Sequence, residues 1–388
     1  MTIYVDGVGM HPFGQFRDKS VIDLARVAIL NALDDAGVRP GDIDAVYSSN
    51  SMNGLLGGQE MIRGQVVLRE LGMHTVPITN IENACASGST AIHQAVLALR
   101  AGAAKRVLVV GFEKMFVDDR DASLAALQSA SDLSVTRDLA LQFTAIYGLR
   151  LQARLESGAV TLDDLADVAV KSHEAGARNP YAQFRKRVSR DEVLASRMIS
   201  DPLTLLMCSS ISDGAAAVVL STDTPAPLDG RARVRVRSSV LRSGDFLLDA
   251  KQKSTATLAA EIAYEEAGVG PTDIGVFEVH DAMAPAELIY YEDLGLCAPG
   301  ESADYLRSGM TAIDGKLPVN PSGGLSSRGH PVGATGVAQI AELTWQLRGE
   351  AGERQVHDTQ LALAQNSGGW LEGPPAACAV HILERSAS

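Results

Sequence analysis

The sequence predicts an α/β fold in which helices cover β-sheets, and three observations lead to this prediction. Apolar runs of strand length alternate with segments of helical period along the 388 residues. A sequence pattern recurs in the second half of the chain, which indicates a duplicated unit. The chain has 36 glycines and only 5% aromatic residues, which favours tight turns and close packing of helices on sheets.

The first half alternates strands and helices from its start. Residues 2–9 (TIYVDGVG) predict a strand. Residues 20–37 predict a helix, because their apolar residues repeat with a helical period and Gly37 is a typical helix end. A strand at 43–49, a helix at 87–102 and a buried strand at 106–114 follow. This order is typical of a sheet with helices on its faces.

The repeat consists of a helix end, a Gly/Pro turn and a strand. Residues 35–49 (DAGVRPGDIDAVYSS) match residues 266–280 (EAGVGPTDIGVFEVH) at an offset of 231 (267 − 36). A second match comes later in the same order: Cys85-x-x-Gly-x-Thr aligns with His330-x-x-Gly-x-Thr at an offset of 245 (330 − 85). Two matches in one order indicate that the second half repeats the α/β unit of the first.

The second match places Cys85 and His330 in equivalent glycine-rich turns, each just ahead of a helix. If the halves pack about a pseudo-twofold axis, the two turns meet near that axis. A thiol at a helix start beside an imidazole is expected to have a lowered pKa, as a nucleophile requires. The glycines would let backbone N–H groups approach a ligand closely. We therefore predict Cys85 as the nucleophile and His330 as its catalytic partner.

One segment has no counterpart in the second half and is predicted to be an insertion. The expected domains are a first half at 1–115 and 201–224, an inserted loop domain at 116–200, and a second half at 225–388. The insertion carries a basic cluster, which is either a solvated surface or a binding site for a phosphate group. Its members are Arg178, Arg185, Lys186, Arg187 and Arg190.

Charge and cysteine usage exclude several classes of protein. The net charge of −13 argues against a nucleic-acid partner, although an anionic ligand needs only a local basic patch. The four cysteines lack metal-ligand spacing, so no metal is expected and reduced thiols in the cytoplasm are predicted. No apolar run reaches the length of a membrane span, so no membrane is expected as a partner.

At these motifs the chain resembles the thiolase superfamily along essentially its whole length. NACASGSTA (83–91) is similar to the nucleophile turn of that family, and NPSGGLSSRGHPVGATG (320–336) is similar to its histidine turn. NPYAQF (179–184) and HDAM (280–283) resemble the sterol carrier protein branch. The resemblance implies a duplicated, five-layered α-β-α-β-α thiolase fold with an inserted loop domain, and a homodimer.

The resemblance also implies roles for single residues. Cys85 would take an acyl group from acyl-CoA, and His330 would activate the thiol and help bind the thioester oxygen. His280 would take the oxyanion-hole place that an Asn fills in most thiolases. Backbone N–H groups of Cys85 and Gly368 would bind the oxyanion of the acyl-enzyme. The basic cluster of the insertion would contact CoA, which is expected as a substrate and not as a covalently bound cofactor. Asp281 is expected to orient a histidine or a turn.

One departure from the family concerns the second catalytic cysteine. Its two known places hold Asn366, in AQNSGGW, and Ala282, in HDAM. Neither side chain can abstract a carbon-bound proton at neutral pH, which argues against ordinary ketoacyl-CoA thiolysis. Asn366 is either an orienting amide or a turn residue.

The predicted function is therefore a thiolase-like acyltransferase that carries an acyl group on Cys85 and forms or cleaves a C–C bond. One alternative is a retro-aldolase or lyase that acts on a CoA thioester together with a small partner of OB fold. Another is a non-catalytic subunit that binds CoA or lipid. The acyl chain, the acceptor and the direction of reaction are left open by the sequence.

Overall fold

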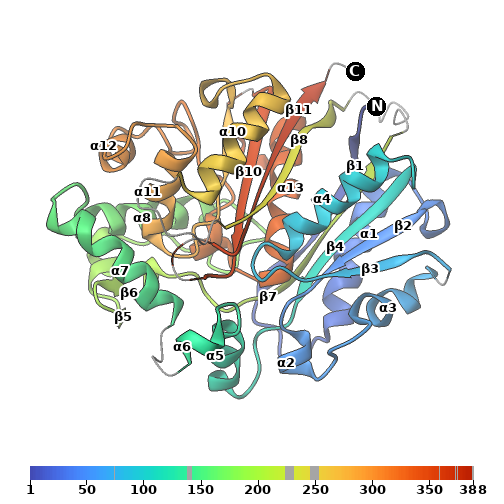
Figure 1. Cartoon of the computed structure of the whole chain (residues 1–388), viewed down its shortest axis with the longest axis horizontal. Coiled ribbons are helices and arrows are strands. Elements are labelled where there is room, and N and C mark those ends of the chain that lie inside the picture. Colours follow the sequence, from blue (N-terminus) through green and yellow to red (C-terminus); the bar gives the residue numbers. More distant parts are fainter. Residues whose placement is uncertain are drawn as a thin grey trace.

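The structure is a computed structural model that describes residues 1–73, 75–137, 142–222, 231–244, 253–357, 359–371, 373 and 375–386 (Figure 1). Its strands are β1 (Tyr4–Gly14), β2 (Ala45–Ser49), β3 (Ile78–Ile81), β4 (Arg106–Glu113), β5 (Met198–Ser200), β6 (Leu203–Thr204), β7 (Asp213–Ser221), β8 (Arg233–Ser243), β9 (Val276–Glu278), β10 (Leu361–Gly368) and β11 (Ala377–Ser386). Its α-helices are α1 (Val21–Ala36), α2 (Asn53–Gly57), α3 (Arg63–Leu68), α4 (Ser87–Arg100), α5 (Arg120–Gln128), α6 (Leu133–Thr136), α7 (Phe143–Glu156), α8 (Leu162–Ala177), α9 (Arg190–Leu194), α10 (Thr255–Ala267), α11 (Ala284–Asp293), α12 (Ser302–Arg307) and α13 (Thr335–Arg348).

The strands of the two halves follow one plan. The nine-stranded sheet has the order β3-β2-β4-β7-β1-β8-β11-β10-β9. In the first half β2 pairs in parallel with β3 and β4, and β7 pairs antiparallel with β4 and β1. In the second half β9 pairs in parallel with β10, and β11 pairs antiparallel with β10 and β8. A parallel bridge from Phe277 to Val319 stands where β3 stands in the first half, so the duplicated unit predicted from sequence is present.

The half-sheets are joined at one edge, which the sequence did not predict. Tyr4 and Val5 of β1 pair antiparallel with Arg235 and Val234 of β8, so the strands form one continuous sheet. Two equivalent edges that pair antiparallel are related by a twofold rotation. The junction therefore lies on the pseudo-twofold axis of the molecule.

Helices complete five layers around the two half-sheets. The helices α4 and α13 pack against each other, and each also contacts strands of both halves, so they form the middle layer. Outer layers are formed by α1 on β1, β4 and β7, and by α10 on β8 and β11 (Figure 1). The predicted α-β-α-β-α arrangement is confirmed, because each half-sheet has one face on the middle helices and the other under an outer helix.

Two glycines explain how closely α1 lies on the sheet. A Cβ at Gly7 would come within 2.3 Å of the carbonyl oxygen of Ala32, and a Cβ at Gly9 within 2.3 Å of that of Ala28. Helix α1 also has its expected ends, with Ser20 and Asp23 in a capping box and Gly37 in the left-handed conformation. The glycine-rich composition thus serves close helix-sheet packing, as predicted.

The chain between β4 and β7 contains the helices α5 to α9 and the short strands β5 and β6. Its longest helix, α8, packs against α11, α12 and a π-helical turn at Gly324–Arg328 in the second half. This segment therefore lies beside the loop that carries His330. Among the described residues, no helix combines the length and the apolar character needed to cross a lipid bilayer.

Candidate active site

Three side chains from distant parts of the chain meet at one point. Cys85 lies in the turn before α4, His280 follows β9, and His330 lies in the loop before α13. The sulfur and one nitrogen of each ring all lie within 4.8 Å of one another. The two imidazole rings meet edge to face, with centroids 5.1 Å apart. A thiolate and two imidazoles are also zinc ligands, so these residues have the donor set to hold that ion.

Glycines bring the two turns together. A Cβ at Gly88 would lie 2.9 Å from the backbone nitrogen of Val337, and one at Gly336 would lie 2.4 Å from that of Ser89. The first turns of α4 and α13 are therefore in backbone-to-backbone contact. The sequence interpretation assigned these glycines to ligand approach, whereas in the structure they let the two helix starts approach each other.

The hydrogen bonds of His330 fix which ring nitrogen carries the proton. Its Nδ1 lies 2.7 Å from Oγ1 of Thr335, and that hydroxyl donates its own hydrogen to the carbonyl of Pro331. Thr335 therefore accepts from Nδ1–H, and Nε2 of His330 has a free lone pair. This nitrogen is the one available to take a proton from Cys85.

His280 has the opposite arrangement. The amide Nδ2 of Asn366 donates to its Nδ1 over 3.0 Å, so the ring hydrogen is on Nε2. The backbone N–H of His280 donates to Oε1 of Gln365. Of the two possibilities for Asn366, the structure favours the orienting amide. One ring can therefore accept a proton and the other can donate a hydrogen bond.

Cys85 is half-buried and both histidines are buried, and this desolvation favours the neutral form of all three groups. Burial is the main cause that raises the pKa of the Cys85 thiol to about 12. A hydrogen bond from the N–H of Gly369 lowers this pKa, and the charge of Glu113 raises it. Burial lowers the pKa of His280 to about 3 and that of His330 well below its usual value, and the nearby Arg328 adds to both shifts. The expectation of a lowered thiol pKa is wrong, because desolvation outweighs the helix start and the neighbouring imidazole is itself uncharged.

Glu113 connects the two halves beneath the site. Its buried carboxylate accepts hydrogen bonds from the side chain of Asn50 and from the backbone N–H groups of Ser51, Met52 and Gly333. Ser51 in turn donates to the carbonyl of Ala84, next to Cys85. Four donors hold a negative charge between the cysteine turn and the histidine turn, although burial raises the pKa of Glu113 to about 7.

Gly368 and Asp281 lie at the margins of the site. A Cβ at Gly368 would come within 2.4 Å of the backbone nitrogen of Ala86, so β10 lies directly against the cysteine turn. The N–H that bonds the thiol belongs to the next residue, Gly369. Asp281 accepts from the N–H of Leu325 over 2.8 Å, and burial raises the pKa of its carboxyl. It thus positions the turn that leads to His330.

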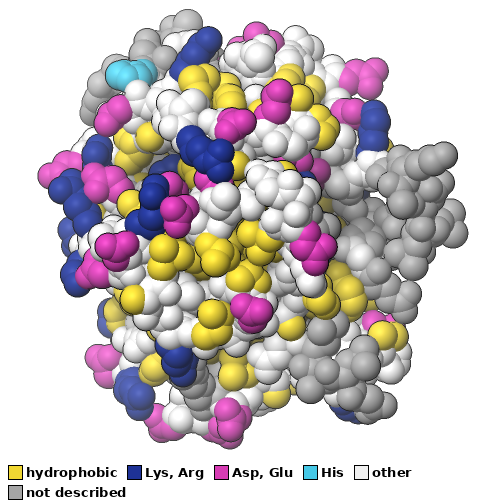
Figure 2. Space-filling model, turned by 90° about the vertical axis from the view of Figure 1, so that its left-hand side faces the viewer, with side chains coloured by type: hydrophobic (Ala, Val, Ile, Leu, Met, Phe, Trp, Pro, Cys, Tyr) yellow, Lys and Arg dark blue, Asp and Glu magenta, His cyan; other side chains and the backbone are white. Residues whose placement is uncertain are grey.

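The basic cluster is placed in ion pairs outside this site. Glu174 binds both Arg178, at 3.0 Å, and Arg187, at 2.7 Å, while Lys186 lies 3.8 Å from Glu192. Arg185 is exposed. Figure 2 shows basic and acidic side chains interspersed on the side of the molecule that lies at the left of Figure 1. A phosphate would have to compete with these carboxylates.

Sequence reasoning did not find Gly369, Thr335 or Glu113. Thr335 was part of the matched pattern around His330, so a signal was present, but its bond to Nδ1 depends on the turn geometry. Gly369 adjoins the predicted Gly368. Glu113 is the last residue of β4, inside the strand predicted at 106–114, and has no local motif, since all four of its partners are distant in sequence.

Family comparison covers both halves of the chain. Residues 3–224 match the family described as "Thiolase, N-terminal domain", and residues 247–385 match "Thiolase C-terminal domain-like". The first of these regions alone is more than half of the 388 residues.

Three curated proteins are similar over nearly the whole chain. Acetyl-CoA acetyltransferase of Methanothermobacter thermautotrophicus is 40% identical, over 99% of this chain and 99% of its own. Benzoylsuccinyl-CoA thiolase subunit BbsB of Thauera aromatica is 37% identical, over 95% and 94%. Sterol carrier protein 2 of Homo sapiens is 35% identical, over 94% of this chain and 70% of its own, which supports the predicted branch.

Among solved structures, the fold is similar to that titled "Ltp2-ChsH2(DUF35) aldolase". The TM-score is 0.79 at 24% identity, and the match covers 100% of this chain and 98% of the other. At this identity the comparison supports the fold alone.

Proposed function

This chain belongs to the thiolase family, and from that premise we propose that it carries an acyl group from a CoA thioester on Cys85 and transfers it to a carbon nucleophile. The chain is an acyl-CoA acyltransferase of thiolase type. The single observation that supports Cys85 as the carrier is its position within 4.8 Å of two imidazole nitrogens.

The first step follows from the two tautomers. Sγ of Cys85 attacks the thioester carbon while its proton passes to Nε2 of His330, and the proton then goes to the departing CoA sulfur. Because thiol and imidazole are both neutral at rest, proton transfer must accompany attack rather than precede it. His280 donates its Nε2–H to the thioester oxygen, and the N–H groups of Cys85, Gly368 and Gly369 surround the oxygen of the acyl-enzyme.

The second step must proceed without a second thiol. Asn366 is already engaged with His280, and Ala282 offers no proton acceptor. We therefore propose that the acceptor is a carbon acid activated by its own carbonyl groups. Nε2 of His330, neutral again after the first step, takes the acidic C–H proton of the acceptor; the carbanion attacks the acyl carbon, a C–C bond forms, and Cys85 leaves and receives that proton from His330. A lyase without covalent catalysis and a non-catalytic binding subunit are the alternatives.

Intact-protein mass spectrometry tests the proposal. Incubation with acetyl-CoA and a panel of longer thioesters is expected to add the mass of one acyl group. Cys85→Ala should abolish the adduct, and Cys208→Ala, which removes a buried thiol beside Met283, should keep it. An adduct that survives Cys85→Ala contradicts the proposal. Turnover by Cys85→Ala without any adduct would favour the lyase.

We further propose that the protein is a homodimer joined at β3. This strand ends the sheet, and the loop beside it exposes Met61 and Ile62, at 76% and 58%. A hollow of about 310 Å³ lies between this loop and β3, and Asn50 and Glu82 also line it. An exposed edge with apolar neighbours is the surface that a second copy would cover. A small partner of OB fold remains the alternative occupant.

We propose that the insertion at 116–200 binds CoA. In the sequence it interrupts the first half, which comprises 1–115 and 201–224, and the second half follows at 225–388. Its exposed Arg185 and the paired Arg178, Lys186 and Arg187 are the candidate phosphate contacts. The cytoplasm remains the predicted compartment, in line with four free cysteines.

A further inference from the structure

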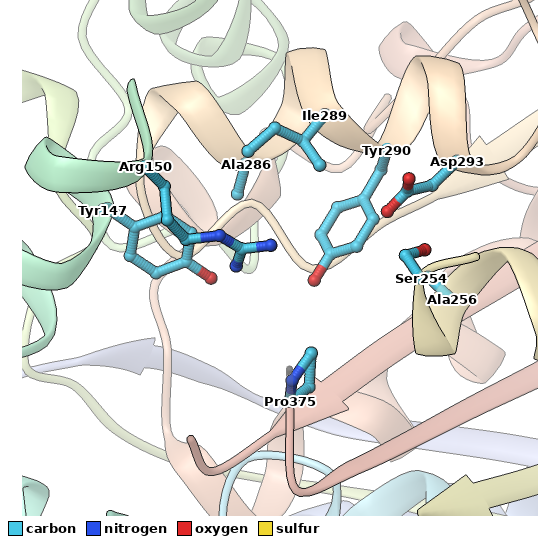
Figure 3. A pocket seen from close by; sticks show the side chains of 9 residues that line it. All are labelled: Tyr147, Arg150, Ser254, Ala256, Ala286, Ile289, Tyr290, Asp293 and Pro375. Atoms are coloured by element: carbon cyan, nitrogen blue, oxygen red, sulfur yellow. The ribbon is translucent and has the colours of Figure 1, made fainter. Parts of the chain in front are cut away.

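A second cavity lies beside α11, the helix that follows His280 in the chain, and the function proposed above does not use it. It opens between α7, α11, the start of α10 and the hairpin from β10 to β11, at Pro375 (Figure 3). Its enclosed part measures about 10 Å³, the space of one water molecule. We call it the Arg150 cleft. A group larger than water would therefore have to bind at the open mouth of the cleft, where Arg150 is exposed.

Hydrogen-bond donors converge on this cleft. The guanidinium of Arg150 and the hydroxyls of Tyr147 and Tyr290 point towards one another (Figure 3). Burial raises the pKa of both phenols, so they remain protonated donors at neutral pH. Tyr290 donates to Oγ of Ser367 over 3.0 Å. Arg150 is exposed and Tyr147 is half-buried, and among the described residues neither has a hydrogen bond or an ion pair, although the charge of Arg150 also acts on Asp293. A cation and a donor are therefore available to a ligand at the mouth of the cleft.

The cleft is close to the reacting groups. Burial is the main cause of the raised pKa of the Tyr147 phenol, and Cys85 and Asp281 are near enough to contribute to it. Ser367, the acceptor of Tyr290, also accepts from Gln365, and Gln365 holds the backbone N–H of His280. The cleft is therefore linked to His280 by a chain of hydrogen bonds through Tyr290, Ser367 and Gln365.

One acidic residue limits where an anion can bind. The carboxyl of Asp293 lines the cleft on the far side of Tyr290 from Arg150 (Figure 3). The hydroxyl of Ser254 bonds this carboxyl, and burial raises its pKa. A ligand carboxylate would therefore bind at the Arg150 side.

We propose that the Arg150 cleft binds a carboxylate carried by the substrate, so that the enzyme prefers acidic over neutral substrates of equal length. The guanidinium takes both carboxylate oxygens and Tyr147 donates to one of them, which is the geometry that arginine favours. The inference rests on the function proposed above, because it assigns the specificity of that site. The carboxylate could belong to the acyl donor or to the carbon acceptor.

A binding experiment tests the donor. In Cys85→Ala protein, which cannot be acylated, succinyl-CoA is expected to bind more tightly than butyryl-CoA, its neutral analogue of four carbons, as measured by calorimetry. Arg150→Met should reduce this preference by about tenfold or more. Arg150→Lys should keep part of it, and Arg39→Met, which removes a remote exposed cation, should leave the ratio unchanged.

A second measurement tests the acceptor. Acetyl-enzyme is mixed with acetoacetate or with its neutral analogue pentane-2,4-dione, and the loss of the acetyl mass is followed. If the carboxylate belongs to the acceptor, Arg150→Met slows discharge to acetoacetate alone.

The outcomes separate the two proposals. An Arg150-dependent preference in either measurement supports the inference. Equal treatment of acidic and neutral partners in both, or a preference that survives Arg150→Met, overturns it. Should no thioester acylate Cys85, the proposed function fails, and the binding measurement alone decides the inference.

Discussion

At the scale of single residues, the site depends on two histidines protonated on different nitrogens. Thr335 makes His330 an acceptor towards Cys85, and Asn366 makes His280 a donor. In both cases a neutral hydrogen-bond partner, and not a carboxylate, fixes the tautomer. A carboxylate would favour an imidazolium, whereas this arrangement keeps both rings uncharged at neutral pH.

The thiol of Cys85 is expected to react slowly with iodoacetamide at neutral pH. Only the thiolate is alkylated, and with a thiol pKa of about 12 the rate should still rise between pH 7 and pH 10. Glu113→Gln removes a charge that raises this pKa, so alkylation at pH 8 should become about three- to tenfold faster. Glu82→Gln removes a weaker influence and should have a smaller effect. A rate that levels off near pH 7 in the native protein would contradict this account.

Replacing Asn366 by leucine should slow acylation of Cys85 without unfolding the protein. His280 would lose the donor that holds the hydrogen on Nε2, and loss of an oxyanion donor costs about two decades in rate. Acylation is measured by rapid quench and intact mass. In a double-mutant cycle, Asn366→Leu should add nothing once His280→Ala is present. Additive losses would show that Asn366 acts elsewhere.

What the sequence predicts at this scale is limited by distance along the chain. Cys85 and His330 were found because the repeat places them at matching positions, and His280 was found through the HD resemblance. The bonds of Asn366 and Glu113 join residues far apart in sequence, so no local pattern contains them. The pKa prediction failed for Cys85 because a helix start is visible in a sequence and desolvation is not.

At the scale of elements, the contact between the starts of α4 and α13 holds Cys85 near His330. This contact has no side chain at Gly88 or Gly336 to adjust it, so its spacing is fixed by the two backbones. Repeats and glycine-rich turns predicted that the two turns are equivalent. Their direct contact could not be predicted, because a glycine that serves a ligand and one that serves a neighbouring helix look alike in sequence.

Gly336→Ala is expected to lower both stability and activity. The new methyl group would lie 2.3 Å from Oγ of Ser89, and overpacking of this kind costs about 1–3 kcal/mol. Acylation should fall as well, because separation of the helix starts moves His330 from Cys85. Thermal unfolding and intact mass measure the two effects. Gly41→Ala, whose methyl group meets nothing within 4 Å, should change stability by less than about 0.5 kcal/mol.

At the scale of the whole molecule, the continuous sheet leaves β3 at one end and β9 at the other. The α/β class and the duplication could be predicted from periodicity and repeats, which are properties of the whole chain. The junction of β1 with β8 could not, because two separate sheets satisfy the same hydrophobic pattern.

Met61→Glu should weaken the proposed dimer. The side chain is 76% exposed in the single chain and lies beside β3, so a buried charge would oppose association there. Mass photometry at nanomolar concentration is expected to show a larger fraction of single chains than in the native protein. Leu30→Glu, on the outer helix α1 and 47% exposed, serves as the control. Equal dissociation of both variants would place the interface elsewhere.

The junction of β1 with β8 also bears on how the molecule could be divided. It is held by main-chain pairing and by packing of α4 on α13, and neither requires a covalent link between β7 and β8. A chain cut there would yield two fragments, each with its own half-sheet and one of the two turns. Co-expressed fragments are therefore expected to assemble and to restore acylation of Cys85, whereas either fragment alone should lack it. The two halves of this single polypeptide therefore associate as two related subunits of a heterodimer would, with a peptide link added between them.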